Sequence, residues 1–354
     1  MKRVNEPIKV YTWGDYQLPG VVPMVWAYHP YGTNVDYGRP LPRTKTYHDP
    51  RFAVTEARRV AAWLRRRGEG ERVLFFFRAG QTNTGLFSKS PAESIVHGPL
   101  IEPTRRWMRE FFAALKNEGI DKLDYFVLDF EDGVSFWVES EAREQMWAEL
   151  KRAHEQKLIE LPDELLAIEP RQAGDWINVD RQLPVKFGKF VGDLRNNAIR
   201  KAIFEPMLEF FPGTPGSNYA DTLRDFATAD SNDWEEPVRR GPAKLIGTHS
   251  APVTYISSGN RYCNLAGEEL SRKKWTDARK RVQSALACEA PVAPWYGWPG
   301  YLDVPLELWR EGLLADVQAG VRTLQIFGEA RHWSAESRQK LAELLPQLQQ
   351  LAAD

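Results

Sequence analysis

Short apolar runs alternate with amphipathic stretches along nearly the whole of this 354-residue chain. The runs at 21–28 and 73–77 predict buried strands, because they are mostly apolar and are followed by polar or glycine-containing loops. The stretches 49–67 and 102–119 repeat apolar residues at helical spacing and end at glycine. Strands and helices that alternate in this way predict parallel units wound in one direction.

The alternation continues to the carboxyl end and indicates the fold class. Further strands are expected at 123–131, 165–170, 214–219, 251–256, 291–296 and 321–327, and further helices at 140–154, 193–211, 274–288, 305–319 and 334–351. No glycine-rich dinucleotide loop follows the first strand, so a closed (β/α)8 TIM barrel fits this α/β pattern better than an open sheet. We expect one domain over residues 1–354 with insertions in the βα loops, including an irregular stretch at about 221–245.

Composition and charge exclude several classes of partner. The chain carries 47 Lys and Arg against 48 Asp and Glu, a net charge of -1, so it has no global basic field for nucleic acid or an anionic membrane. The run Arg65–Arg67 ends a predicted helix, where cations complement the helix dipole. No apolar run approaches the roughly 20 residues of a membrane span. Nucleic acid and membrane are therefore not expected as partners, and the oligomeric state is left open.

Cysteines and the amino terminus bear on the compartment. Cys263 and Cys288 form no CxxC motif, which argues against a disulfide framework and a thiolate zinc site, and both are expected to be core thiols. The stretch Met1–Pro7 lacks the apolar segment of a secretory signal, which predicts a cytoplasmic protein; the processed form of a secreted protein would look the same.

The stretch Leu123–Gly133 ends an apolar strand with two carboxylates. Asp129 and Glu131 are two residues apart, and residues i and i+2 of a strand share a face, so both would point the same way about 6 to 7 Å apart. Both would lie at the carboxyl end of the third predicted barrel strand, on the face that holds the active site in α/β barrels. Two acids there destabilise the fold unless they are paired, which favours a functional role.

The absence of other catalytic motifs leaves carboxylate chemistry as the candidate. The sequence has no GxSxG elbow, no GxxxxGK phosphate loop and no HExxH zinc helix, and its six histidines show no paired spacing. In glycoside hydrolysis, one acid protonates the leaving group while a second carboxylate or the substrate itself stabilises the oxocarbenium-like centre. No cofactor and no metal-ligand set is expected for this reaction.

Three carboxylates are the catalytic candidates. We expect Glu131, nearer the mouth of the barrel, to be the general acid. Asp129, deeper in the site, would raise the pKa of Glu131 by like-charge repulsion. Glu329 ends the last predicted strand and would approach the same rim, although an ion pair with Arg331 in solvent is the alternative.

A short motif resembles a known family. Asp124, Asp129 and Glu131, with Phe130 between the last two, resemble the strand motif DxxDxDxE of chitinase-like glycoside hydrolases, which are substrate-assisted TIM barrels. The shorter LDxE stretch is also similar to barrel-type lysozymes and hyaluronidases. The resemblance implies that Glu131 is the proton donor and that Asp129 steers the acetamido group of the substrate. Val127 stands where the chitinase motif has its middle aspartate.

Aromatic residues suggest what the cleft binds. The chain has 13 Trp, 12 Tyr and 17 Phe, and flat side chains in loops suit stacking on sugars, although a large core also uses many of them. Trp295 resembles the tryptophan floor of chitinase-like sites. The expected substrate contacts all follow predicted strands: His29, Arg78, Asn218, Tyr219, Tyr255, Trp295, Tyr296 and Trp298. As a set they describe a polar and aromatic cleft, which suits a carbohydrate.

Hydrolysis of an oligo- or polysaccharide is the function that these patterns favour, and two alternatives stay open. In the first, Asp129, Glu131 and Glu329 bind magnesium or calcium through oxygen, which predicts a response to a chelator. In the second, a barrel without catalysis serves as a sugar-binding or assembly component. The missing middle aspartate and the missing signal favour that second alternative.

Overall fold

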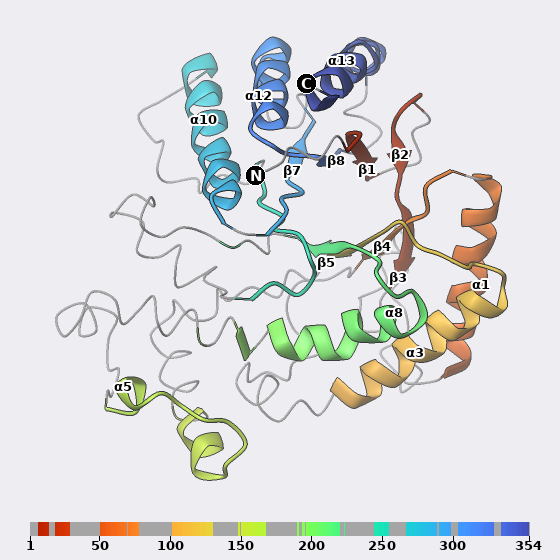
Figure 1. Cartoon of the computed structure of the whole chain (residues 1–354), viewed down its shortest axis with the longest axis vertical. Coiled ribbons are helices and arrows are strands. Elements are labelled where there is room, and N and C mark those ends of the chain that lie inside the picture. Colours follow the sequence, from red (N-terminus) through yellow and green to blue (C-terminus); the bar gives the residue numbers. More distant parts are fainter. Residues whose placement is uncertain are drawn as a thin grey trace.

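A computed structural model describes most of the secondary structure of the chain (Figure 1). The described residues are 6–13, 18–28, 50–68, 70–77, 101–129, 150–167, 196–219, 244–254, 267–288, 290–298, 304–328 and 334–353, with the single residues 148, 190, 193, 194 and 223. Every strand pairing within this part is parallel. The mixed α/β class with parallel sheets, predicted from the sequence, is therefore confirmed.

The strands form two four-stranded sheets. Their bounds are β1 Lys9–Thr12, β2 Val22–Pro23, β3 Val25–Tyr28, β4 Val73–Phe77, β5 Tyr125–Asp129, β6 Gly216–Asn218, β7 Trp295–Gly297 and β8 Thr323–Phe327. The order is β2-β1-β8-β7 in one sheet and β3-β4-β5-β6 in the other.

The helices alternate with these strands along the chain. Their bounds are α1 Pro50–Arg66, α3 Ile101–Asn117, α5 Asp163–Leu166, a π-helical turn η3 Arg200–Phe204 that runs into α8 Glu205–Phe210, α10 Gly267–Leu286, α12 Leu306–Gln318 and α13 Ala335–Ala353. Figure 1 shows α10, α12 and α13 next to β7, β8 and β1, with α1, α3 and α8 around β3, β4 and β5.

Two connections join the sheets. Only Met24 separates β2 from β3, and its backbone N–H donates to Thr12 O at 2.9 Å, so residues 22–28 act as one strand between β1 and β4. On the other side, residues 249–253 make parallel bridges from His249 to Ser217 of β6 and from Val253 to Trp295 of β7. The pairings therefore pass from β1 through both sheets and back to β1.

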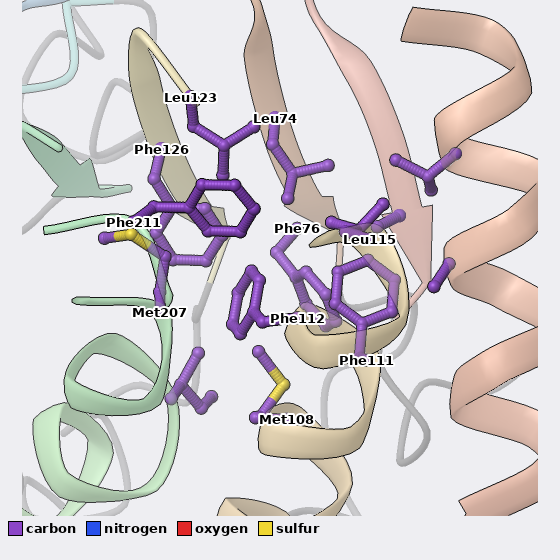
Figure 2. Close-up of a cluster of buried hydrophobic side chains, with 14 of the residues drawn as sticks. Leu74, Phe76, Met108, Phe111, Phe112, Leu115, Leu123, Phe126, Met207 and Phe211 are labelled. Atoms are coloured by element: carbon purple, nitrogen blue, oxygen red, sulfur yellow. The ribbon is translucent and has the colours of Figure 1, made fainter. Parts of the chain in front are cut away.

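Side chains alternate between two faces of the strands. On β5, Phe126 and Leu128 pack beneath the helices, whereas Tyr125 and Val127 belong to a separate cluster inside the ring of strands. Figure 2 shows the first of these clusters, in which Phe76 of β4 and Phe126 lie against α3. The ring of Phe76 meets that of Phe111 edge-on at 5.4 Å. A matching cluster lies between β1, β7, β8 and helices α10, α12 and α13.

A close approach explains one glycine of β6. A Cβ at Gly216 would lie 2.3 Å from the carbonyl oxygen of Phe126 and 2.9 Å from the ring of Phe204. Both distances are shorter than van der Waals contact, so only glycine lets β6 lie this close to β5 and to the π-helical turn.

Most predicted elements are present, and four details differ. Residues 165–170 were expected to be a strand, but Leu165 and Leu166 belong to the helix α5. This helix begins after Pro162, and Asp163 and Glu164 favour its first turn. The strand that carries Asp129 is the fourth of the ring, since the four-residue β1 gives too short a signal to be predicted. Of the strand expected at 251–256, residues 251–254 are described, and among these only Val253 makes an isolated bridge, to Trp295. Cys288 is half-buried near the end of α10 and is not a core thiol, and Cys263 lies outside the described residues.

Candidate functional site

Asp129 is the last residue of β5, and its side chain faces the interior of the ring of strands. It continues the face of Tyr125 and Val127, both of which belong to the inner cluster, because alternate residues of a strand share a face. It pairs in register with Phe77 and is 5% exposed. Asp129 therefore ends a buried strand on the face shared with Tyr125 and Val127.

Aromatic rings from five strands meet in the same interior. We call Trp13, Trp26, Phe75, Trp295 and Phe327 the aromatic box. The ring of Trp13, just after β1, lies at 4.6 Å from Trp26, 4.7 Å from Phe75 and 4.9 Å from Phe327, with interplanar angles of 67° to 70°. Trp295 lies farther away at 6.5 Å and 68°. The planes of the other rings are thus steeply inclined to the plane of Trp13, in the edge-to-face geometry that aromatic pairs prefer.

The rings of the aromatic box differ in burial. Phe75 and Trp295 are fully buried, whereas Trp13, Trp26 and Phe327 are half-buried. Of these half-buried rings, Trp13 directly follows β1 and Phe327 ends β8, at the same carboxyl side as Asp129, whereas Trp26 is the second residue of β3. Solvent therefore reaches aromatic surface at the end of the ring where the carboxylate lies.

The interior farther from the carboxyl ends of the strands contains polar side chains. Gln325 Nε2 donates across the ring to Ser217 Oγ at 3.3 Å and to Ala293 O at 2.7 Å. Tyr11 donates to Glu71 Oε2 at 3.0 Å, and its ring lies 5.2 Å from that of Tyr125. Burial raises the pKa of both tyrosines, with Glu71 adding to the effect on Tyr11. Both hydroxyls therefore stay protonated and act structurally.

His249 belongs to this part of the interior. Its ring packs edge-on against Tyr125 at 5.3 Å, and Nδ1 lies 2.8 Å from Thr248 Oγ1. Burial, and secondarily the charge of Lys9, lowers the pKa of His249 to about 4. The imidazole is thus neutral at physiological pH and lies several residues below Asp129 along the strands.

Two of the predicted substrate contacts lie inside the ring. Tyr219 and Trp295 belong to the inner cluster, with their rings 5.8 Å apart. Asn218 pairs with Leu128 on the other face, is fully buried, and donates through Nδ2 to Tyr219 O at 3.1 Å. The structure therefore places Asn218 beneath the helices and away from the interior.

Two other predicted contacts also face outward. Tyr296 donates to Asp316 Oδ2 of α12 at 2.9 Å, and Trp298 packs against Trp309 at 5.1 Å. Both are fully buried beneath the helices. We expected the aromatic residues around Trp295 to line one cleft, whereas the period of two along a strand places them on opposite faces.

The remaining predicted site residues lie outside the described part of the chain. They are the catalytic candidates Glu131 and Glu329 and the substrate candidates His29, Arg78 and Tyr255.

Several interior residues were not predicted from the sequence. Trp13, Trp26, Phe75 and Phe327 face the same interior as Asp129, yet none was predicted as a site residue. A signal for two of them was present: Trp13 follows Tyr11 by two residues, and Phe327 follows Gln325 by two, so each extends an inward face past a strand end.

No family model matches the sequence. No curated protein sequence matches it significantly either. The solved structures that match this chain include bee venom hyaluronidase, with a TM-score of 0.30 and 14% identity over 70% of this chain and 79% of that one. The same enzyme in complex with a hyaluronic acid tetramer matches with a TM-score of 0.32, 15% identity, and coverage of 70% and 77%. A GH18 chitinase from Pseudoalteromonas aurantia matches with a TM-score of 0.35, 10% identity, and coverage of 82% and 80%. At these TM-scores and identities the matches assign neither a family nor an activity to this chain.

Among the described residues, no three His, Cys, Asp or Glu side chains gather closely enough to hold a metal ion. No helix in the same part of the chain is both long and apolar enough to cross a membrane.

Proposed function

We propose that this chain is a (β/α)8 barrel that hydrolyses an oligo- or polysaccharide by carboxylate general acid catalysis. The observation that carries the proposal is the inward position of Asp129 at the carboxyl end of β5, beside half-buried aromatic rings. In α/β barrels this end of the strands holds the active site.

The register of the strands supports a closed barrel. Tyr28 pairs with Phe77, and Phe77 pairs with Asp129. When this register is followed through β6, residues 249–253, β7, β8 and β1, it returns to the Val22 strand at Gly20, eight residues before Tyr28. A displacement of eight residues over eight strands is the shear of a TIM barrel.

The proposed catalytic roles follow from the strand period. Glu131, two residues beyond Asp129, is the proposed proton donor, because residues two apart in a strand share a face. Asp129 supplies a negative charge that disfavours ionisation of Glu131 and stabilises the positive charge of the transition state. Phe327 faces inward, and Glu329, two residues later, is the proposed third carboxylate at the same rim.

The aromatic box supports a carbohydrate substrate. Sugars present apolar C–H faces that stack on aromatic rings, and the half-buried Trp13, Trp26 and Phe327 offer such surface next to the carboxylate. Of the substrate contacts expected from the sequence, Tyr219 and Trp295 line the same interior.

Hydrolysis is tested with the purified protein on chromogenic glycosides and on chitin and peptidoglycan fragments. We expect turnover of at least one substrate, a loss of about 10²- to 10⁴-fold in kcat for Glu131→Gln, and a comparable loss for Asp129→Asn. Glu118→Gln is the matched control, because Glu118 pairs with Arg58 and Arg65 on the outer surface. Full turnover by Glu131→Gln on a substrate that the parent cleaves would show that Glu131 is not the acid.

Two further measurements separate the alternatives. Loss of turnover on addition of a chelator would favour metal-dependent chemistry over carboxylate acid catalysis. Oligosaccharide binding without any cleavage would favour a non-catalytic binding protein.

A further inference from the structure

Polar side chains from three strands meet deep inside the ring of strands. Gln325 of β8 reaches across the interior to Ser217 of β6, and Tyr125 of β5 faces the same interior. Gln325 precedes Phe327 by two residues and Tyr125 precedes Asp129 by four, so both lie farther from the carboxyl ends of the strands than Asp129 does. Gln325 is 0%, Ser217 1% and Tyr125 1% exposed. Bulk solvent therefore does not satisfy the polar groups of these three side chains.

The orientation of the Gln325 amide is fixed by its neighbours. Its Nε2 donates to Ala293 O at 2.7 Å and to Ser217 Oγ at 3.3 Å. A backbone carbonyl only accepts hydrogen bonds, so the nitrogen of the amide has to face Ala293, and the flipped orientation is excluded. Within the described part of the chain, the buried Oε1 of Gln325 has no hydrogen-bond partner. The interior thus contains an amide oxygen that needs a donor.

The Tyr125 hydroxyl is a second buried group of this kind. Burial raises the pKa of Tyr125 and the Ser217 hydroxyl opposes this effect, so the two hydroxyls lie near each other. They do not reach hydrogen-bond geometry, and no other described residue bonds to the Tyr125 hydroxyl. Because burial of a hydroxyl without a hydrogen bond is unfavourable, a donor and an acceptor that lie close together here both need a partner.

Small side chains line the side of the interior to which Gln325 extends. Ala251 and Ala293 belong to the inner cluster, and Ser217 lies on the neighbouring strand β6. Bulky branched side chains usually fill the interior of α/β barrels, and these three small ones leave room that such side chains would occupy. Buried water requires room and two to four polar partners, and the surroundings of Gln325 Oε1 offer both.

We propose that one ordered water molecule bridges Tyr125, Ser217 and Gln325 inside the ring of strands. The water accepts hydrogen bonds from the two hydroxyls and donates one to Oε1 of Gln325, which gives the roughly three hydrogen bonds that buried water typically makes. The three groups are neutral, so this site has no charge with which to balance a buried ion. The proposal does not depend on hydrolysis, because the site lies deeper in the interior than Asp129.

A high-resolution crystal structure of the intact protein tests the site directly. We expect density for a water molecule within about 2.5 to 3.2 Å of Gln325 Oε1, Ser217 Oγ and the Tyr125 hydroxyl oxygen. Absence of density at this position, including the case in which the Tyr125 hydroxyl bonds directly to the Gln325 amide, would overturn the proposal.

Variants test the same site in solution. Magnetic relaxation dispersion of the solvent water counts the buried water molecules that exchange slowly. Gln325→Met removes the amide but keeps a side chain of similar length, and we expect one slowly exchanging water fewer than in the parent. Gln350→Met is the matched control, because Gln350 is exposed on α13 and the count should stay unchanged.

A second variant covers the possibility that Gln325→Met does not fold, which circular dichroism and melting curves show. Tyr125→Phe removes only the hydroxyl, and we expect it to shorten the residence time of the water, because one of its three hydrogen bonds is lost. Relaxation that is the same as in the parent for every folded interior variant would also overturn the proposal.

Discussion

The side-chain amide of Gln349 in α13 makes two hydrogen bonds with the backbone of Ile8, just before β1. Ile8 N donates to Oε1 at 3.0 Å, and Nε2 donates to Ile8 O at 2.8 Å. This pair ties the last helix to the first strand of the ring, 341 residues away in the chain.

Removal of this amide should loosen that junction. Gln349→Ala leaves both backbone groups of Ile8 without the amide in a half-buried position, and we expect it to lower the free energy of unfolding by about 1 to 3 kcal/mol. Urea denaturation measures the change. Gln350→Ala, the exposed neighbour, should alter stability by less than about 0.5 kcal/mol. Equal effects of the two substitutions would contradict the role of the pair.

A buried ion pair joins α10 to α12. Arg279 Nη2 donates to Asp316 Oδ1 at 2.7 Å, and Asp316 is 1% exposed and also accepts from Tyr296. Burial alone would lower the pKa of Arg279, but hydrogen bonding and the charge of Asp316 outweigh it and raise the pKa. Burial, with Asp316, also raises the pKa of Tyr296, so the hydroxyl stays a donor.

Loss of one partner of this pair should be strongly destabilising. Arg279→Met leaves the buried charge of Asp316 without its cation, and we expect a loss of about 3 to 5 kcal/mol in the free energy of unfolding. Arg310→Met, which breaks the exposed pair with Glu307, should change it by less than about 1 kcal/mol. Thermal and chemical denaturation of both variants measure these changes in the free energy of unfolding. A small effect of Arg279→Met would show that Asp316 does not need its cation.

The same helix pair depends on a glycine. A Cβ at Gly312 of α12 would lie 2.5 Å from Cζ2 of the buried Trp275 in α10. Gly312→Ala is therefore expected to destabilise the protein by about 1 to 3 kcal/mol, although alanine usually stabilises a helix. Glu311→Ala at the exposed neighbouring position should be nearly neutral. A higher melting temperature for Gly312→Ala would show that the helices can move apart freely.

Acid should destabilise the protein through His249. Its folded-state pKa of about 4 lies below the value of about 6.5 expected in the unfolded chain. The unfolded state therefore binds the proton first, so the stability contributed by neutral His249 is fully present above about pH 6.5 and is lost as the pH falls toward 4. The loss is at most about 3 kcal/mol.

A variant separates this histidine from the other acid-sensitive groups. His249→Phe keeps an aromatic ring against Tyr125 but cannot take up a proton. Its free energy of unfolding should fall less steeply between about pH 6.5 and 4 than that of the parent, as followed by urea denaturation at several pH values. Parallel pH profiles would mean that His249 is protonated as easily in the folded as in the unfolded state.

The local elements were largely predictable because their signals are local. Apolar residues at helical spacing indicated α1, α3, α12 and α13, and the all-apolar run of β4 indicated a buried strand. Where the signal was short or mixed, prediction failed. β1 has only four residues, and the leucines of α5 resemble a strand until the acidic first turn after Pro162 is considered.

For the site, the sequence by itself determined that Asp129 ends a buried strand, because an apolar run closed by a carboxylate is a property of consecutive residues. Tertiary structure alone decided which side chains lie around it. Trp13, Trp26 and Phe327 come from opposite ends of the chain, and Trp295 and Tyr296 are neighbours in sequence but lie on opposite faces of β7. The physical reason is that the period of a strand divides residues between two faces, while the long-range pairing of parallel strands determines which face becomes the common interior.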